Sequence, residues 1–460
     1  MTRFQRWMGC AALAVSLLAA GSLAAPAAPA PASSRPRSVI LMIPDGCGWA
    51  SITLARIYAG HALVLDGILV GACETAPADG LITDSAAAAT AYASGVKTRN
   101  HELGLTPDQK PVATVLEGAQ ARGLSTGLVA TSRITHATPA AFASHVPERD
   151  DEDEIALEEM AHHIDVLFGG GRLQFAPRGG GGHRTDGRDL MSEARRAGCQ
   201  VIVSRAELRS VSRPPVLGLF APDHMNYEVD RDTLIEPSLA EMTRKALAIL
   251  SRNPRGFFVM IEGSRVDHAA HQNDAATHVR EVLAYDEAVA AALEFARRDG
   301  HTLVISVSDH ECGGLTDGSW SDRDSVSALK PELLHHARAS AARMAGEIQG
   351  GEAIEAVLAR DAGVGDPAPE EIAALREAIA HGGLTEAIGT LVSRRARVGW
   401  TSRGHTAVDV GLYAYGPGTD RLRGTHQNID VAHIIATLLG LDLAGLTSKL
   451  QQAAGTPAHN

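Results

Sequence analysis

Asp267 and His271 stand four residues apart, shortly after the apolar run at residues 257–261. An aspartate and a histidine at this spacing share one face of a helix, where they could bind one metal ion. The segment Ser264-Arg-Val-Asp267 also has the form of a capping box, in which Asp267 would only accept hydrogen bonds from backbone N–H groups. The segment alone leaves both interpretations open, so the metal interpretation depends on further ligands elsewhere in the chain.

Other acids and histidines also stand next to apolar runs. Glu262 ends one such run, Asp45 follows another, and Asp309 with His310 follows a third. His405 stands in the segment Ser-Arg-Gly-His-Thr, just ahead of a further apolar run. Each of these side chains alone could be a turn acid, a helix cap or a polar residue with ordinary hydrogen bonds. Their shared position at the ends of apolar runs favours one common metal centre.

Aspartate and histidine groups of this kind suit zinc in a site that leaves one position open for water or substrate. The chain has enough of them for two such sites. Two metal ions about 4 Å apart can hold the attacking and leaving oxygens of a phosphoryl transfer. The remaining oxygen ligands, Glu262 and a shared Asp45, suit magnesium. The sequence therefore indicates phosphoryl chemistry at a centre of several metal ions.

A candidate nucleophile stands in the segment Thr-Asp-Ser-Ala-Ala-Ala-Ala-Thr at residues 83–90. The alanine run predicts a helix that begins near Ser85, where free N–H groups and the helix dipole favour negative charge. A hydroxyl at that place beside two zinc ions can lose its proton and attack phosphorus, although an ordinary N-cap has the same sequence. Arg149 could then hold two phosphate oxygens in a bidentate fork, or it could be a surface arginine of an acidic stretch.

Short apolar, β-branched runs alternate with longer stretches of helical spacing. The runs are residues 39–43, 125–130, 201–203, 257–261, 303–307 and 411–414, and the predicted helices include 111–122, 238–251 and 266–298. This alternation predicts an α/β fold, a three-layer α/β/α sandwich with a large, mainly parallel central sheet. In such folds ligands bind beyond the carboxyl ends of the strands, which is where the residues above would meet.

Residues 319–398 differ from the rest of the chain. They are rich in alanine and charged residues, and they contain no convincing strand. We interpret this stretch as an inserted helical cap or crown subdomain, over the site or in a dimer contact. The catalytic domain would then comprise residues 37–318 and 399–455.

The N-terminus has the layout of a cleavable secretory signal peptide over residues 1–25. Arg3 and Arg6 precede an apolar stretch at residues 8–20, and small residues follow. That stretch is too short for a membrane anchor, and no later segment approaches a spanning length. An Ala/Pro-rich linker follows at residues 26–36. We expect a periplasmic or secreted protein with no membrane span after signal cleavage.

The formal net charge of −12 becomes −14 once the two arginines of the signal peptide are removed. This acidic balance argues against a nucleic-acid binding surface, although a local cluster of cations can still bind small anions. An oxidising compartment permits two disulfides, in three pairings, among the cysteines of the mature chain: Cys47, Cys73, Cys199 and Cys312. Cys47 and Cys312 each lie two residues beyond a candidate ligand, and they are expected to come near each other. Without a C-x-x-C spacing, zinc ligation by cysteine is the weaker interpretation.

In these motifs the chain resembles the alkaline phosphatases. The matching segments follow the family's order: 43–46 (Ile-Pro-Asp-Gly), 83–87 (Thr-Asp-Ser-Ala-Ala), 136–140 (His-Ala-Thr-Pro-Ala), 262–271, 309–310 and 404–406. The resemblance covers residues 39–318 and 399–440. Each motif is short, but their combination is highly specific.

The resemblance implies a hydrolase of small phosphate monoesters that uses two zinc ions and one magnesium ion. The zinc ligands would be two sets of three: Asp267, His271 and His405 for the first ion, and Asp45, Asp309 and His310 for the second. The magnesium site would share Asp45 and be completed by Thr138 and Glu262. The resemblance also implies that Ser85 becomes phosphorylated, that Arg149 holds the phosphate, and that the protein forms a homodimer.

Two histidines occupy positions that vary within the family. His136 and His268 would border the third metal site and the phosphate pocket. Because nitrogen ligands favour zinc or cobalt over magnesium, zinc or cobalt is the alternative metal there. We favour the interpretation that His136 hydrogen-bonds a metal-bound water. Pro44 and Cys47 replace a glycine and a methionine that are common in the family, and neither change removes a ligand.

Three other functions compete with this one: a phosphodiesterase or a sulfatase of the same superfamily, and a non-catalytic zinc or phosphate binding protein. Sulfatases need a Cys or Ser in a C/S-x-P-x-R setting, which Ser85 lacks. Phosphodiesterases of this fold usually present threonine and lack the third metal site, whereas Ser85, Thr138 and Glu262 are all present. A non-catalytic protein predicts loss of Ser85 or Arg149, and the chain has both.

Overall fold

The computed structural model describes residues 35–318 and 329–454. The predicted signal peptide, the predicted linker as far as residue 34, and the first residues of the predicted insertion, 319–328, lie outside the described residues.

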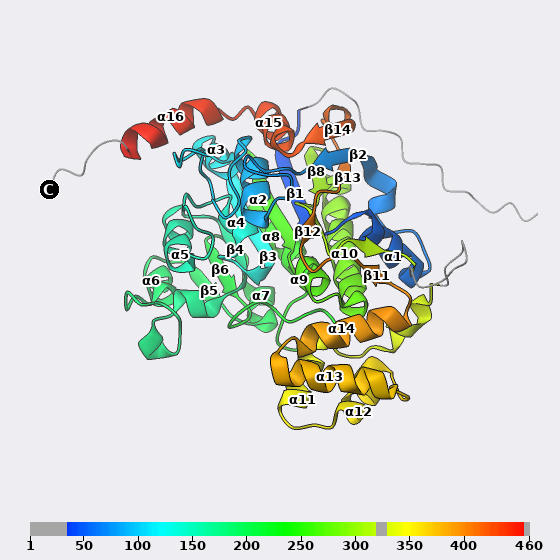
Figure 1. Ribbon diagram of the computed structural model, residues 1–460. Coiled ribbons are helices and arrows are strands. Elements are labelled where there is room, and N and C mark those ends of the chain that lie inside the picture. Colours follow the sequence, from blue (N-terminus) through cyan, green and yellow to red (C-terminus); the bar gives the residue numbers. More distant parts are fainter. Residues whose placement is uncertain (1–34, 319–328, 455–460) are drawn as a thin grey trace, which may run out of the picture.

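A ten-stranded sheet forms the centre of the molecule (Figure 1). Its spatial order is β14 (Gly424–Gln427), β2 (Leu69–Glu74), β13 (Val410–Tyr415), β8 (Thr302–Val307), β1 (Ser38–Pro44), β7 (Phe257–Gly263), β3 (Ser125–Arg133), β4 (Val166–Gly170), β6 (Val216–Leu219) and β5 (Gln200–Ile202). Neighbouring strands are parallel except where β13 pairs with β2 and β8. The predicted mainly parallel sheet is confirmed.

Helices cover both faces of the sheet, because successive residues of its buried strands point to opposite sides. In β1, Ile40 and Met42 join one apolar cluster, and Leu41 and Ile43 join the other. The first cluster contains residues of α1 (Trp49–Ala59), α8 (Leu239–Leu250) and α10 (Ala275–Asp299). The second contains residues of α2 (Ser85–Ser94), α3 (Val115–Ala121), α4 (Ala137–Ala140), α5 (Glu152–Ala161), α6 (Leu190–Arg196) and α15 (Asn428–Leu439). The result is the predicted three-layer α/β/α sandwich.

The predicted helix at residues 266–298 is two helices, α9 (Arg265–His271) and α10. The break has a local cause, because Asn273 adopts the left-handed conformation (φ 52°) and the side chain of Asp274 caps α10 by accepting from the Thr277 N–H. The continuous helix expected from the apolar spacing is therefore wrong at residues 272–274.

Two short antiparallel ladders lie next to the carboxyl edge of the sheet. In one, β9 (Glu311–Cys312) pairs with β12 (His405–Thr406), so that His405 stands opposite Cys312. In the other, β10 (Leu315–Thr316) pairs with β11 (Gly399–Trp400). These ladders connect the segment after β8 with the segment that leads to β13.

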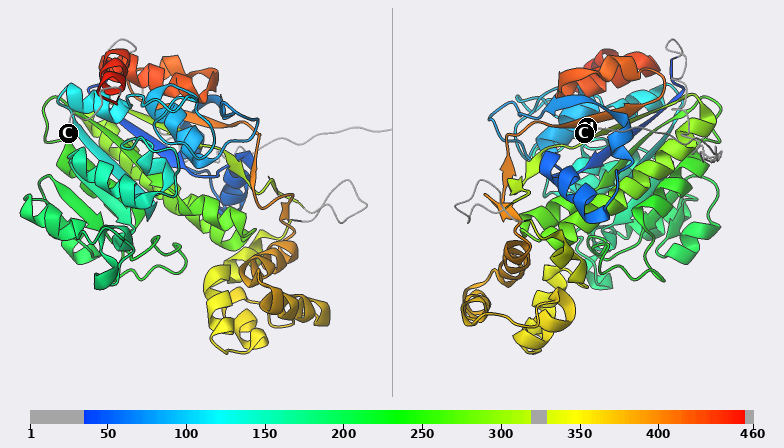
Figure 2. Two further views of the ribbon diagram at one scale, coloured as in Figure 1. Left: turned by 60° about the vertical axis from the view of Figure 1, so that its left-hand side comes forward. Right: turned by 90° about the vertical axis from the view of Figure 1, so that its right-hand side faces the viewer.

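The described part of the predicted insertion, residues 329–398, is folded into helices. They are a 3₁₀ turn (Pro331–His336), α11 (Ala341–Gln349), α12 (Ile354–Val357) with a π-turn (Leu358–Ala362), α13 (Pro369–His381) and α14 (Leu384–Arg395). They project from one end of the molecule (Figure 2). Met344, Leu375 and Ile388 belong to the same apolar cluster as α10, so these helices pack on the main body. Their role as a cap or dimer contact stays a prediction.

No single helix among the described residues is long and apolar enough to cross a membrane. Helices α15 and α16 (Leu443–Ala454) pass that test only as a pair, with a bend of 108° between them. The remaining α-helix of the described chain, α7 (Arg205–Ser210), follows β5.

Candidate metal and phosphate site

Three adjacent strands bring the predicted acids to one edge of the sheet. Strand β1 lies between β7 and β8, and its residue Ile43 is level with Glu262. Asp45 follows β1, and Asp309 with His310 follows β8, so these side chains meet beyond the carboxyl ends of the strands. All four side chains are fully buried.

The turn after β1 allows a close approach to α9. Gly46 has φ +70°, and a Cβ atom at this residue would lie 2.6 Å from Asp267 Oδ1. The Gly46 N–H donates to Asp309 Oδ1 at 3.1 Å. Glycine is therefore required both for the left-handed turn and for the contact with Asp267.

The first candidate metal group consists of Asp45, Asp309 and His310. His310 Nε2 lies 3.1 Å from Asp309 Oδ2 and 3.5 Å from Asp45 Oδ1. Burial and the neighbouring carboxylate of Asp309 raise the pKa of Asp45 well above its usual value. Neither carboxylate oxygen of Asp45 has a hydrogen-bond partner among the described residues. Buried acceptors without donors are costly, and a bound cation would remove that cost.

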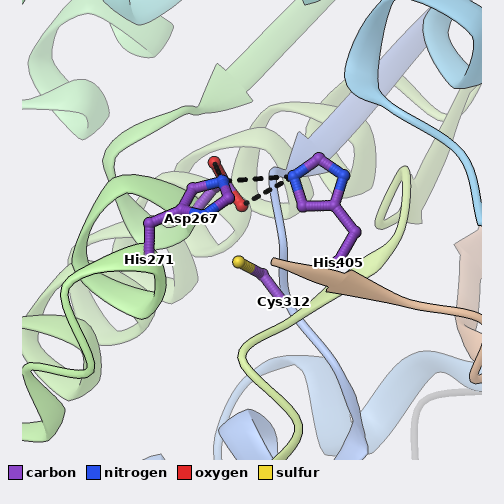
Figure 3. Close-up of side chains that lie close together, drawn as sticks. All are labelled: Asp267, His271, Cys312 and His405. Carbon is purple, nitrogen blue, oxygen red and sulfur yellow. Dashed lines mark hydrogen bonds and ion pairs between the residues drawn. The ribbon is translucent and has the colours of Figure 1, made fainter. Parts of the chain in front are cut away.

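The second candidate group consists of Asp267, His271 and His405, with Cys312 beside them (Figure 3). His271 Nε2 lies 3.1 Å from Asp267 Oδ2 and 3.1 Å from His405 Nε2. Of the two interpretations left open for residues 264–267, the capping box is not formed, because Ser264 makes no side-chain cap bond and Asp267 faces the histidines.

Backbone carbonyls fix the orientation of both imidazoles in this group. His271 Nδ1 lies 2.5 Å from the carbonyl oxygen of Arg403, and His405 Nδ1 lies 2.8 Å from that of Thr83. A carbonyl can only accept, so each Nδ1 carries the proton, and the two Nε2 atoms face each other and Asp267. This is the arrangement in which two neutral histidines and a carboxylate bind zinc.

The pKa values of the two histidines differ because their neighbours differ. Burial lowers the pKa of His271, but the Asp267 carboxylate outweighs burial and raises that pKa to about 9. Burial and the nearby His310 lower the pKa of His405 to about 4. The His310 and His405 rings are stacked with centroids 3.5 Å apart, so the two candidate groups are in direct contact.

Cys312 was the weaker candidate for a ligand on sequence spacing, yet its Sγ lies with the ligand atoms of the second group. It arrives there through the β9–β12 ladder, a non-local pairing that no local spacing reveals. Its backbone N–H donates to the carbonyl of Gly46 at 3.2 Å, next to Cys47. The four cysteines of the described residues are all free thiols.

A third candidate group joins Asp45 and Glu262 with His136. Burial raises the pKa of Glu262 to about 7. Glu262 Oε1 and His136 Nδ1 have no hydrogen-bond partner among the described residues. Thr138 Oγ1 is also buried without a hydrogen-bond partner among the described residues, and His136 brings a nitrogen ligand to the edge of this oxygen-rich group.

Ser85 is the first residue of α2 and is almost fully buried. Its Oγ lies 3.3 Å from Nε2 of His310, which belongs to the candidate group with Asp45 and Asp309. Asp84, and not Ser85, is the N-cap, because Asp84 Oδ1 accepts from the Ala87 N–H at 3.0 Å. The Ser85 hydroxyl is therefore left free for other chemistry at the positive end of the helix.

Arg149 lies between α2 and the third group. Its Nη1 donates to Asp84 Oδ2 at 2.9 Å, and its Nη2 lies 3.3 Å from His136 Nε2. Burial opposes the charge, but Asp84 more than offsets it and raises the pKa of Arg149. A permanently charged guanidinium is thus held by Asp84, the residue before Ser85, where it could bind an oxyanion.

His136 and His268 form a cluster with a third histidine, His224, that the sequence analysis missed. The ring centroid of His136 lies 5.5 Å from that of His224 and 5.5 Å from that of His268, and the centroids of His224 and His268 are 4.5 Å apart. Burial and nearby arginines lower the pKa of all three, that of His224 to about 3. The signal for His224 was the apolar run at residues 216–220 just before it, which is strand β6 and its end.

Comparisons with known proteins agree with the fold described above. The family model described as alkaline phosphatase matches residues 36–441. Alkaline phosphatase 4 of Bacillus subtilis is 39% identical over 88% of this chain and 88% of its own length. The structure of Thermus thermophilus alkaline phosphatase superposes with a TM-score of 0.81 at 30% identity and covers 92% of this chain and 96% of that one. A variant of the TAB5 alkaline phosphatase, solved with magnesium bound, has a TM-score of 0.67 at 26% identity and covers 89% of this chain and 99% of that one.

Proposed function

The chain belongs to the alkaline phosphatase family of phosphomonoester hydrolases, and we propose that its catalysis proceeds through a phosphoserine formed on Ser85. The observation that carries this proposal is the position of the Ser85 hydroxyl, 3.3 Å from His310 Nε2 at the start of α2. The three groups of buried carboxylates and imidazoles beside it have the donor types that the metals of this chemistry need.

We propose three metal positions with the ligands expected from the sequence. Asp267, His271 and His405 would bind one zinc ion, and Asp45, Asp309 and His310 a second. Asp45, Thr138 and Glu262 would bind magnesium, the metal bound in the TAB5 variant. His136 adds a nitrogen at this last position, and zinc or cobalt is the alternative there. The orphaned oxygens of Asp45 and Glu262 support these assignments.

Bound zinc ions lower the pKa of the attacking hydroxyl and stabilise the charge of the leaving oxygen. The residues of the chain do the rest. Helix α2 presents Ser85 Oγ for in-line attack on phosphorus, and Arg149 holds two non-bridging oxygens of the phosphate. Asp84 keeps Arg149 in place. Water then hydrolyses the phosphoserine in a second in-line step, so two inversions give retention at phosphorus.

The test compares hydrolysis of p-nitrophenyl phosphate, bis-p-nitrophenyl phosphate and p-nitrophenyl sulfate by the zinc- and magnesium-loaded protein, with and without chelator. We expect the monoester to be cleaved fastest and chelator to abolish turnover. Faster cleavage of the diester or the sulfate would contradict the monoesterase assignment. No hydrolysis of any ester would leave a binding protein as the explanation.

Two variants test the roles of individual residues. Ser85→Ala should keep its metal content and lose activity by three orders of magnitude or more, as enzymes do when a serine nucleophile is removed. Ser94→Ala, at the other end of α2, is the matched control and should stay active. His405→Ala should lose one zinc ion and activity together. A Ser85→Ala protein with substantial turnover would refute the phosphoserine.

We also propose that the chain is exported to the periplasm or beyond, on the basis of residues 1–25, and that it forms a homodimer. Mass spectrometry of the protein from culture should show an N-terminus near residue 26. Light scattering of the purified protein should give twice the mass of one chain. An unprocessed N-terminus or the mass of a single chain would contradict the respective proposal.

A further inference from the structure

A second cluster of metal-ligating side chains lies outside the catalytic site. It consists of Glu117 on α3, His145 in the segment after α4, and His162 at the C-terminal end of α5. Helices α3 and α5 lie near each other on one side of the molecule (Figure 1). None of the three residues belongs to the three groups described above. The side chains are mostly buried, with exposed fractions of 12% for Glu117, 14% for His145 and 22% for His162.

The ligand atoms converge on one point. Glu117 Oε1 lies 3.3 Å from His145 Nε2 and 3.9 Å from His162 Nε2, and all three atoms lie within 4.8 Å of one another. Tetrahedral zinc with bonds of about 2.0–2.1 Å requires ligand atoms roughly 3.3 Å apart. Small rotations of the His162 side chain would therefore complete the geometry.

Neighbouring groups already orient two of the ligands toward the common point. His145 Nδ1 lies 2.8 Å from the carbonyl oxygen of Gly104, so Nδ1 donates to that carbonyl, and Nε2 faces Glu117 Oε1 at 3.3 Å, where a metal ion would replace the shared proton. Glu117 Oε2 accepts from the Thr114 N–H at 2.8 Å in a capping box, which leaves Oε1 for the cluster. Backbone groups of Gly104 and Thr114 thus fix the orientation of the His145 and Glu117 side chains.

The partly exposed ring of His162 makes no hydrogen bond to the described protein groups. Its distance of 3.9 Å from Glu117 is too long for a hydrogen bond, and its ring makes none within residues 35–318 and 329–454. Its backbone, in contrast, is held in place, because Gln120 Nε2 on α3 donates to its carbonyl oxygen at 2.7 Å. The fold thus brings the His162 ring to 3.9 Å from the Glu117 carboxylate without using its nitrogens in a protein hydrogen bond.

We propose that Glu117, His145 and His162 bind a zinc ion, with water as the fourth ligand on the partly exposed side of His162. Two imidazoles and one carboxylate are a set that zinc accepts and that magnesium does not favour. This proposed zinc site does not depend on the proposed catalytic mechanism, and it shares no ligand with the three candidate groups of the catalytic site.

The zinc ion would cross-link α3, the end of α5 and the loop at residues 141–151, which also carries Arg149. The backbone of this loop is paired with residues 101–104, because Leu103 N donates to Val146 O and Arg149 N donates to His101 O, both at 2.9 Å. His145 stands four residues before Arg149 on the same loop. Zinc at His145 would thus stabilise the backbone from which the phosphate-binding guanidinium extends.

The test is the zinc content of the full chain after equilibration with zinc and dialysis, measured by elemental analysis. His162→Gln should contain one zinc ion fewer per chain than the wild type and should still hydrolyse p-nitrophenyl phosphate at saturating metal. The matched control is His163→Asn, because His163 is the exposed neighbour with a left-handed backbone (φ 50°) that asparagine tolerates. This control should keep the wild-type zinc content.

Glu117→Gln provides a second, independent variant that retains the capping box, since glutamine can take the place of glutamate there. It should also lose one zinc ion. Wild-type zinc content in both variants would overturn the proposal and leave an ordinary Glu117–His145 ion pair. A variant that lost a catalytic metal would lose activity as well as zinc. The activity assay therefore distinguishes a failure of this zinc site from a failure of the catalytic assignment.

Discussion

Asp84 links the helix of the nucleophile to the phosphate-binding arginine. Its Oδ1 caps α2 by accepting from the Ala87 N–H at 3.0 Å, and its Oδ2 accepts from Arg149 Nη1 at 2.9 Å. Oδ2 also accepts from the His101 N–H at 3.1 Å. One carboxylate therefore sets both the start of α2 and the position of the guanidinium, and two substitutions can separate these roles.

Asp84→Asn retains a single carboxamide oxygen, which can cap α2 or bind Arg149 but cannot do both. Asparagine is as good an N-cap as aspartate, so we expect the cap to persist and the arginine contact to be lost. Asp84→Ala loses both. Removal of the cap should cost about 1 kcal/mol of stability in the alanine variant only.

Loss of the hydrogen bond between Asp84 and Arg149 should weaken phosphate binding in both variants. A hydrogen bond to a charged group contributes about 1.5–3 kcal/mol, and both side chains are about 15% exposed, so solvent screens the pair only in part. If about 1 kcal/mol of this is passed on to the contact with phosphate, the inhibition constant of inorganic phosphate rises roughly fivefold. The KM for the monoester should rise by a similar factor in both variants.

The assay is competitive inhibition of p-nitrophenyl phosphate hydrolysis by inorganic phosphate, together with thermal unfolding at a fixed metal concentration. Asp189→Ala is the matched control, because Asp189 caps the distant helix α6 by accepting from the Ser192 N–H. It should lose stability without a change in phosphate inhibition. An unchanged inhibition constant in both Asp84 variants would refute the positioning of Arg149 by this carboxylate.

Three further predictions concern the metal groups. Metal-free Asp45→Asn should be more stable than the metal-free wild type by about 1–3 kcal/mol, because it removes a buried carboxylate that accepts no hydrogen bond and lies among other carboxylates. The metal-loaded variant should be inactive. Equal midpoints of chemical unfolding in chelator would contradict this prediction. Zinc must displace the proton of His271, whose pKa is raised to about 9, so the zinc affinity measured by chelator competition should fall as the pH drops below about 9. In the metal-free protein, the His271–Asp267 ion pair contributes its full stabilisation below pH 6.5. That stabilisation is lost as the pH rises through about 9. Cys312→Ser should keep zinc content and turnover, since a fourth protein ligand would close the position that substrate needs; loss of zinc in this variant would identify the thiol as a ligand.

The strand ends could be predicted from the sequence because the central strands are buried on both faces. Residues 39–43, 257–261 and 303–307 are uninterrupted apolar runs, and the acids that follow them must then share one edge. Strand β14 reads Gly-Thr-His-Gln at the rim of the sheet and is mostly exposed, so its sequence carries no such signal. Strand β2 was missed for the same reason, since only Cys73 in it is buried.

Contacts that depend on pairing between distant segments could not be predicted from spacing. The meeting of Cys312 with His405 depends on the two-residue ladder of β9 with β12. The contact of Asp84 with Arg149 depends on where the loop at residues 141–151 passes α2. In each case the local sequence permits the contact, and only tertiary packing selects it.

The pairing of β1 determines when the catalytic metal centre can form. Val39 pairs with Phe258 on one side and with Leu303 on the other, so the central strand finds its partners more than 200 residues later in the chain. Such a topology has a high contact order and folds slowly. Asp267 and His271, in contrast, are brought together by a single turn of α9 and are available to zinc early. Before the sheet closes, zinc can therefore meet only this incomplete pair, whereas after closure it meets the complete ligand set.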